Sequence, residues 1–128
     1  LDVERAIALA LVHDVPEAVM GDLPRTAVGL LPEGAKAAAE RRAAGELLGP
    51  IYDHALRLWD EVEAGGTREA RFVKACDRLQ LGVKLVAYHR AGRRGLDEFR
   101  ETVAGLDLSE FACLGRLRDE VLAALETR

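Results

Sequence analysis

The longest uninterrupted helical pattern in this 128-residue chain runs from Arg68 to about Arg90. Its apolar residues recur at steps of four, three, four and three, which is the spacing of one face of an α-helix. This stripe consists of Phe72, Cys76, Leu79, Val83 and Val86. Ala, Leu, Arg and Glu are abundant and aromatic residues make up only 5% of the chain, a composition that favours helices over sheets. We therefore expect an all-α protein.

Prolines and glycines divide the rest of the chain into shorter helices. The pattern predicts a buried, central helix from about Asp2, its N-cap, to Asp14, and a short helix from Pro16 to Met20. Residues 21–32 contain two prolines and two glycines and are predicted to form a loop. Further helices are expected at residues 33–48, 51–64, 68–90, 97–104 and 110–125, the last of them capped by Ser109. The chain shows no repeats and no domain boundary, which indicates a single domain.

The net negative charge of the chain excludes some classes of binding partner. The net charge is −4 and the pI is about 5.4, so we expect neither a nucleic-acid polymer nor an anionic membrane as partner. A small anionic substrate remains compatible, because a bound metal ion supplies positive charge locally. Cys76 and Cys113 are too few and too far apart for a disulfide framework. We expect both to be reduced, buried thiols, which is typical of a cytoplasmic protein.

The dipeptide His13-Asp14 ends a wholly apolar run, residues 6–12, and stands just before Pro16. Consecutive residues on a continuous helix point about 100° apart. At a helix end broken by proline, however, an imidazole and the next carboxylate can face one ion from two sides. We expect the apolar run to carry both groups into the interior, where an uncompensated charge is costly. The predicted compensation is a divalent cation, and the alternative is a core histidine paired with its neighbour.

Two further carboxylates follow closely. Glu17 comes one turn after Asp14, and Asp22 follows Gly21 in the predicted loop. A carboxylate beside a metal site that does not bind the metal can take a proton from the attacking water. We therefore interpret Glu17 and Asp22 as candidate catalytic residues. The alternatives are an acid in a first helical turn, stabilised by the helix dipole, for Glu17, and an Asx turn for Asp22.

A second cluster lies in the long helix. Asp77 shares a helical face with Val73 and Leu81, so its carboxylate leaves an apolar stretch and requires a cation. Lys74, three residues earlier, is one candidate. A metal ion held jointly with His13 and Asp14 is the other.

The remaining candidates are interpreted as ordinary. His54 precedes an apolar stripe and His89 lies near a helix C-terminus, where positive charge is favourable. Trp59 and Tyr52 are expected to be core or subunit-contact residues. The basic cluster after the long helix is interpreted as a solvated loop, with a phosphate-steering role as the alternative. This cluster comprises Arg90, Arg93 and Arg94.

The segments ALVHDVPEAVMGDLP (residues 10–24) and TREARFVKACDRLQ (residues 67–80) resemble the HD-domain phosphohydrolases. They are most similar to the small 5'-deoxynucleotidase-like branch, whose pattern is H…HD…D with a glutamate three residues after the HD aspartate and a Gly-Asp shortly afterwards. The resemblance covers most of residues 2–90. It implies a single helical HD domain over residues 1–128, with the metal-site core at 2–90 and C-terminal helices at 97–127.

The resemblance also implies a role for each site residue. The implied metal ligands are His13, Asp14 and Asp77. The metal would be one divalent ion, and mixed imidazole and carboxylate ligation suits Mn, Co, Fe, Zn or Mg. Glu17 would orient or deprotonate the attacking water, and Asp22 would assist that water or bind the sugar. Lys74 would face the phosphate of the substrate or structure the site.

The family's first metal-binding histidine and its neighbouring phosphate-binding arginine are not found in residues 1–128, and we expect them to precede Leu1. The resemblance implies a phosphomonoester hydrolase acting on nucleoside or deoxynucleoside 5'-monophosphates. It also implies a homodimer, for which the Ala-rich helix at residues 33–48 is a candidate contact surface. The alternatives are hydrolysis of an alarmone, a deoxynucleoside triphosphate or a cyclic diester, or a non-catalytic nucleotide-binding module.

Overall fold

The computed structural model describes residues 1–126, which form eight α-helices and no strand. The prediction of an all-α protein is therefore confirmed. The helices form two compact units, of which the first ends at Arg71 and the second begins at Phe72. The boundary lies inside helix α6 (Arg68–Arg90), whose first turn belongs to the first unit.

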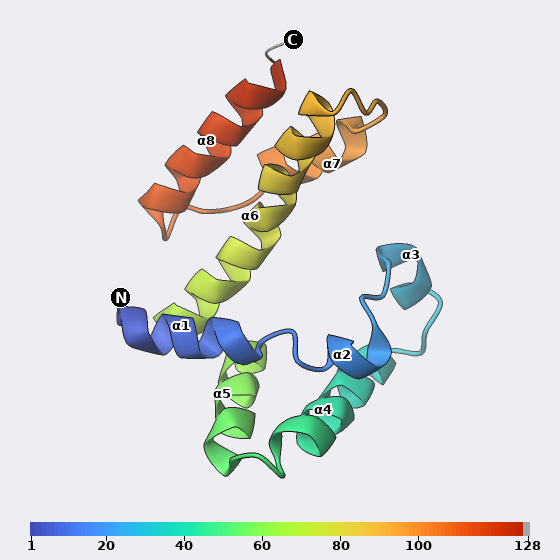
Figure 1. Ribbon diagram of the computed structural model, residues 1–128, viewed down its shortest axis with the longest axis vertical. Helices are drawn as coiled ribbons and strands as arrows, with labels where there is room; N and C mark the ends of the chain where they lie inside the picture. The colour runs from blue at the N-terminus through green and yellow to red at the C-terminus, as the bar shows by residue number, and fades with distance from the viewer. Residues whose placement is uncertain (127–128) are drawn as a thin grey trace. The chain divides into compact units, whose positions relative to one another are not determined.

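In the first unit, α1 and α4 pack against α5, and the short α2 packs against α4 (Figure 1). The bounds of these helices are α1 (Val3–Val12), α2 (Glu17–Met20), α3 (Arg25–Val28), α4 (Ala35–Leu48) and α5 (Asp53–Ala64). Gly65, in the left-handed conformation with φ 62°, ends α5 where the sequence predicts. The Thr67 hydroxyl accepts a hydrogen bond from the Ala70 backbone N–H at 3.2 Å, so Thr67 caps α6.

Helix α1 begins at its predicted cap, because an Asp2 carboxylate oxygen accepts a hydrogen bond from the Arg5 backbone N–H at 3.0 Å. Its burial differs from the prediction of a wholly buried helix. The face toward α5 is buried, but Ile7 and Leu11 on the other side are 57% and 76% exposed. The apolar run indicated burial all round, whereas α1 packs along one side only. The buried face consists of Ala6, Leu9 and Val12.

The predicted loop at residues 21–32 contains one helical turn, α3, which corrects the sequence interpretation. Pro24 stands just before it, and the Val28 backbone N–H donates to the Pro24 carbonyl at 3.0 Å. A proline is compatible with the start of a helix, because the first backbone N–H groups there have no acceptor within the helix. The two prolines thus indicated a break in the chain without excluding a short helix between them.

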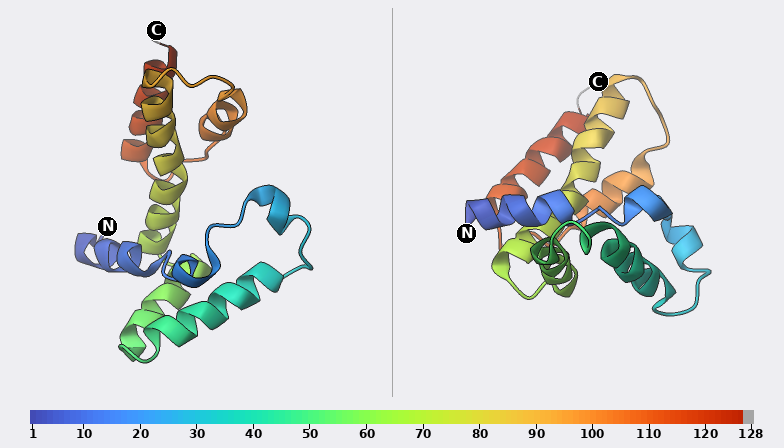
Figure 2. Two further views of the ribbon diagram at one scale, coloured as in Figure 1. Left: turned by 45° about the vertical axis from the view of Figure 1, so that its right-hand side comes forward. Right: turned by 60° about the horizontal axis from the view of Figure 1, so that its bottom comes forward.

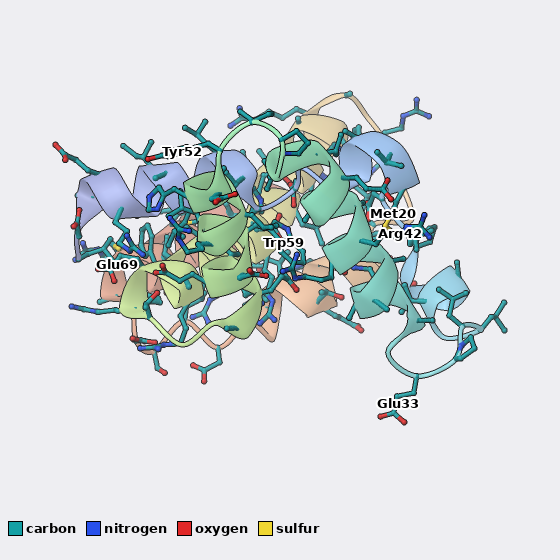
Figure 3. All side chains as sticks on the ribbon, turned by 90° about the horizontal axis from the view of Figure 1, so that it is seen from below. Met20, Glu33, Arg42, Tyr52, Trp59 and Glu69 are labelled. Carbon is teal, nitrogen blue, oxygen red and sulfur yellow. The ribbon has the colours of Figure 1, made fainter. Side chains whose placement is uncertain are left out.

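Trp59 on α5 lies on the side of that helix that faces α4 (Figure 3), and its side chain is buried. The guanidinium of Arg41 on α4 lies 5.9 Å from the centre of the Trp59 ring, within the range of a cation–π contact. The Arg41 Nε also lies 3.0 Å from Asp60 Oδ1 on α5. Trp59 is therefore a core residue, which is one of the two roles expected for it. Tyr52 is exposed and is not part of the core.

The second unit contains most of α6 together with α7 (Asp97–Ala104) and α8 (Ala112–Glu126), and α8 runs alongside α6 (Figure 2). The Phe72 and Phe111 rings meet edge to face with centroids 5.1 Å apart. The prediction that Ser109 caps the last helix is wrong, because α8 begins at Ala112. The Ser109 backbone N–H donates to Asp107 Oδ1 at 3.0 Å, in a turn before α8. The buried core of this unit comprises Leu79, Leu85, Val103, Leu108, Phe111, Leu114 and Val121.

The two cysteines are free and lie in this unit. Cys76 is half-buried, and burial raises the pKa of its thiol. Cys113 is exposed, so the expectation that both thiols are buried is wrong for Cys113. Position 127, the end of the predicted C-terminal helices, lies outside the described residues.

Gly82 on α6 allows the close approach of α7 and α8. A Cβ at this position would lie 3.0 Å from a Val121 methyl and 3.1 Å from a Val103 methyl. Both valines are buried, so neither methyl can move aside without disturbing the core. In contrast, a Cβ at Gly115 on α8 would have no neighbour within 4 Å.

We predict opposite effects for two glycine-to-alanine variants in this unit. Gly82→Ala should lower the free energy of unfolding by about 1–3 kcal/mol, the usual cost of overpacking a core. Gly115→Ala should raise it by about 0.5–1 kcal/mol, because alanine is the better helix former. Urea denaturation followed by circular dichroism measures both. A Gly82→Ala protein as stable as Gly115→Ala would contradict the packing described here.

Candidate metal and catalytic site

His13 is the C-cap residue of α1, and its ring is anchored to that helix. The Nδ1 atom lies 2.6 Å from the backbone carbonyl oxygen of Ala10. A carbonyl oxygen only accepts hydrogen bonds, so Nδ1 is the donor and carries a proton. In the neutral imidazole this leaves Nε2 as an acceptor with an available lone pair. The helix end therefore fixes both the orientation and the tautomer of His13.

The Nε2 atom faces the neighbouring carboxylate. Asp14 Oδ2 lies 3.0 Å from His13 Nε2, and the two side chains are 54% and 25% exposed. When His13 is protonated, Nε2 donates to this carboxylate and the two groups form an ion pair. When His13 is neutral, the Nε2 lone pair and the carboxylate are both available to a metal ion. Sequence reasoning predicted this pairing, and the structure brings the two groups together. The expected burial is met only in part, because Asp14 is exposed.

Pro16 shapes the turn that follows. The Val15 backbone N–H donates to the Val12 carbonyl at 3.2 Å, and the Glu17 N–H donates to the Asp14 carbonyl at 2.9 Å. These tight bonds close α1 and begin α2, with Pro16 as the N-cap residue of α2 and Glu17 as its first residue. Glu17 is therefore tied through its backbone to Asp14, and its side chain is exposed.

Asp22 follows Gly21, whose φ of 68° ends α2 in a conformation that favours glycine. The Asp22 carboxylate is exposed. It makes no hydrogen bond or ion pair with any group that the structure describes, so the Asx-turn alternative is not observed. The structure thus places Asp22 on the unit that carries His13 and Asp14, but shows no direct contact between them.

Lys36 on α4 is a cation near this region that sequence reasoning missed. Its pKa is raised, first by the hydrogen bond to Glu40 and further by the carboxylates of Glu63 and Glu17, against the opposing effect of burial. Lys36 lies 19 positions after Glu17 in an Ala-rich helix. Only the packing of α2 on α4 reveals that their charges interact.

The two remaining candidates lie on α6, in the second unit. Asp77 is exposed, and its helix neighbours on the same face are the buried Val73 and the half-buried Leu81. Lys74 is half-buried one turn earlier. Asp77 is two helical turns after the buried Ala70, at the same angular position on α6. The predicted membership of Asp77 and Lys74 in a site with His13 stays a prediction.

A second polar contact holds α1, and therefore His13, on α5. Arg5 donates through Nη2 and Nε to the two carboxylate oxygens of Glu61, the Nε bond being 3.2 Å long. The Thr67 hydroxyl donates to Glu61 Oε1 at 2.7 Å. These bonds, led by the one from Arg5, lower the pKa of Glu61 below its usual value of 4.5. The Asp2 N–H, in turn, donates to Glu69 Oε1 at 2.8 Å, which joins the start of α1 to α6.

Comparison with protein families identifies the class. Residues 1–112 match the family model described as "HD domain", so the chain belongs to the HD-domain family. That match spans most of the chain and includes residues 13 and 14. Within residues 1–126, no helix combines the length and the apolar character needed to cross a bilayer.

Individual relatives sharpen the resemblance. The chain is 29% identical to the human 5'-deoxynucleotidase HDDC2 over 82% of its length and 53% of the relative's. It is 32% identical to the Xenopus laevis protein of the same name, over 82% of this chain and 54% of that protein. The solved structure of the PH0347 protein from Pyrococcus horikoshii OT3 superposes with a TM-score of 0.76 at 28% identity, over 97% of this chain and 68% of that one. The chain thus spans about half the length of the curated relatives it matches.

We predict that Glu61→Gln loosens the attachment of α1 to α5. It should lower the free energy of unfolding near pH 7 by about 1 kcal/mol, because the Arg5 pair loses its charge. The depressed pKa of Glu61 means that the ionised carboxylate stabilises the fold above pH 4.5, and that this contribution is lost as the pH falls through the lower folded value. The difference between wild type and variant should therefore vanish in acid.

The control is Glu46→Gln, which removes the exposed i,i+4 pair between Arg42 and Glu46 on α4. It should change stability by no more than about 0.5 kcal/mol. Chemical denaturation from pH 7 down to pH 3 measures all three proteins. An undiminished effect of Glu61→Gln at low pH would contradict the assigned ion pair.

Proposed function

We propose that this protein is a divalent-metal-dependent phosphohydrolase that releases phosphate from nucleoside or deoxynucleoside 5'-monophosphates. The observation that carries the proposal is the His13–Asp14 contact, in which an imidazole nitrogen and a carboxylate oxygen, both metal-ligand types, lie 3.0 Å apart. Membership of the HD-domain family and similarity to proteins named 5'-deoxynucleotidase support the substrate class.

The donor atoms of this pair fit a metal ion. In octahedral coordination, bonds of about 2.1 Å that meet at about 90° hold neighbouring donor atoms about 3.0 Å apart. The separation of Nε2 and Oδ2 has this value. Metal-binding histidines almost always donate their other ring N–H to a carbonyl or carboxylate, and Ala10 supplies that carbonyl to Nδ1. His13 is thus prepared to bind through Nε2.

Asp77 is proposed as the third ligand from this chain. His13, Asp14 and Asp77 each offer one atom of a type that binds divalent ions. The resemblance to the H…HD…D pattern assigns Asp77 to the same set.

The carboxylates after Pro16 are proposed to act on the attacking water. A divalent ion held by this set would polarise the phosphoryl group and lower the pKa of a bound water. Glu17, whose backbone N–H is bonded to the Asp14 carbonyl, would accept the proton of that water. Asp22 would orient the water or bind the sugar hydroxyls, and Lys74 would bind the phosphate oxygens. Lys36, whose positive charge interacts with the Glu17 carboxylate, would stabilise the ionised form of Glu17.

The assembly and location of the protein belong to the same proposal. We propose a homodimer in the cytoplasm, with the exposed alanines of α4 as the contact surface. These alanines are Ala37, Ala38 and Ala39.

We predict that Glu17→Gln lowers kcat by about 10²–10⁴-fold, the usual contribution of a general base. Metal binding should be retained, because Glu17 is not a ligand. Phosphate release is measured on a panel of deoxynucleoside monophosphates, deoxynucleoside triphosphates, an alarmone and a cyclic diester, with Mn²⁺, Co²⁺ or Mg²⁺ added. The monophosphates should be the preferred substrates, and a chelator should abolish turnover.

Glu33→Gln is the matched control, because Glu33 is exposed and its side chain extends away from the helices (Figure 3). It should leave kcat unchanged. Full activity of Glu17→Gln would contradict the mechanism, whereas preference for another nucleotide would contradict only the substrate class. Binding without turnover of any substrate would identify a non-catalytic nucleotide-binding module.

A further inference from the structure

A polar cavity lies wholly within the second unit. It has a volume of about 220 Å³ and is formed by the end of α6, the loop that follows, the start of α7 and one residue of α8. Pockets for drug-sized ligands span about 300–1,000 Å³, so this cavity suits a smaller group. Its lining contains His89, Arg93, Arg94 and Arg100 among its polar residues, with Asp97 as the single carboxylate.

The charge of this region is opposite to that of the whole chain. Residues 78–96 contain no aspartate or glutamate, although the chain has 22 acidic and 18 basic residues. The basic residues in this stretch are Arg78, Lys84, Arg90, Arg93 and Arg94. The cavity lies at the end of the stretch, where the positive charges are most closely spaced along the chain.

Two of the lining arginines have no acidic partner within the described residues. Arg100 pairs with Glu126 at 2.7 Å, and Asp97 offsets one further positive charge. Arg93 and Arg94, by contrast, have no ion pair or side-chain hydrogen bond within the described part of the chain, and both are exposed. The Arg93 backbone is fixed nevertheless, because its N–H donates to the Tyr88 carbonyl at 3.0 Å and Gly92 turns the chain with φ 78°.

We propose that this cavity binds a small phosphorylated anion through Arg93 and Arg94. Guanidinium groups bind phosphate oxygens with charge-assisted hydrogen bonds that are often bidentate, and both of these arginines line the same cavity. The apolar Leu96 and Leu125 line the other part of the cavity and leave room for a small organic group beside the phosphate. The site is independent of the proposed metal ligands, since residues 89–125 supply its whole lining.

The test is a titration of the ¹⁵N-labelled protein with pyrophosphate, at constant ionic strength and with a chelator present, followed by backbone amide NMR. We expect saturable shifts at the amides of residues 92–97. Arg93→Gln combined with Arg94→Gln should weaken this binding at least about tenfold. Arg57→Gln combined with Arg116→Gln removes the same charge from exposed positions outside the cavity and should change the affinity less than twofold.

Each other result overturns the proposal. Shifts confined to residues 13–22 would place pyrophosphate at the other site, and equal shifts with NaCl would indicate only screening. An equal loss in the control variant would indicate attraction by net charge alone. If the double variant fails to fold, the single variants Arg93→Gln and Arg94→Gln are measured instead, and each should bind pyrophosphate more weakly than the control variant does. The phosphate-release assay of the Glu17→Gln variant tests the proposed function separately, so the two proposals can fail independently.

Discussion

The end of α1 at Pro16 is the constraint on which the candidate site depends. Proline has no N–H to offer the Val12 carbonyl, and its ring would clash with that carbonyl in a continuing helix. The Val12 carbonyl instead accepts a bond from the Val15 N–H at 3.2 Å. His13 and Asp14 therefore fall at a helix end, where adjacent side chains can converge. In the middle of a helix they would diverge.

The end of α1 also determines which nitrogen of the His13 ring faces Asp14. The last turn of α1 presents the Ala10 carbonyl to His13 Nδ1, which leaves Nε2 to face Asp14 Oδ2. The backbone thus places an imidazole nitrogen and a carboxylate oxygen side by side, and both are atom types that bind divalent ions. The same turn begins α2 with Glu17, so one short segment positions both the proposed metal-binding pair and the proposed base. The bonds from Arg5 to Glu61 then hold α1 on α5.

Local features were predictable from the sequence, and features that depend on packing were not. Helical spacing and glycine or proline punctuation predicted α6 and α7, because their ends are fixed by neighbouring residues. One wrong expectation was the complete burial of α1, since an apolar run does not reveal how many neighbours a helix has. Ser109 was assigned as a cap because Asp107, two residues earlier, was not recognised as the competing acceptor.

The site shows the same division. The contact of His13 with Asp14 followed from their adjacency and from Pro16. The charge of Lys36 near Glu17 did not, because it depends on α2 packing against α4. Likewise, the sequence indicated that Arg93 and Arg94 are solvated, but not that they line a cavity with Leu125 on α8. Interactions between residues far apart in the chain carry no local pattern that a single sequence displays.

The central claim is that His13 holds a proton on Nδ1 and offers Nε2 to a metal ion. Long-range ¹H–¹⁵N NMR of the histidine side chains tests this directly, with His54 and His89 as internal references. The account predicts that neutral His13 is protonated on Nδ1, and that Zn²⁺ shifts its Nε2 resonance and leaves the Nδ1 proton in place. A His13 ring protonated on Nε2, or one whose resonances Zn²⁺ does not change, would contradict it.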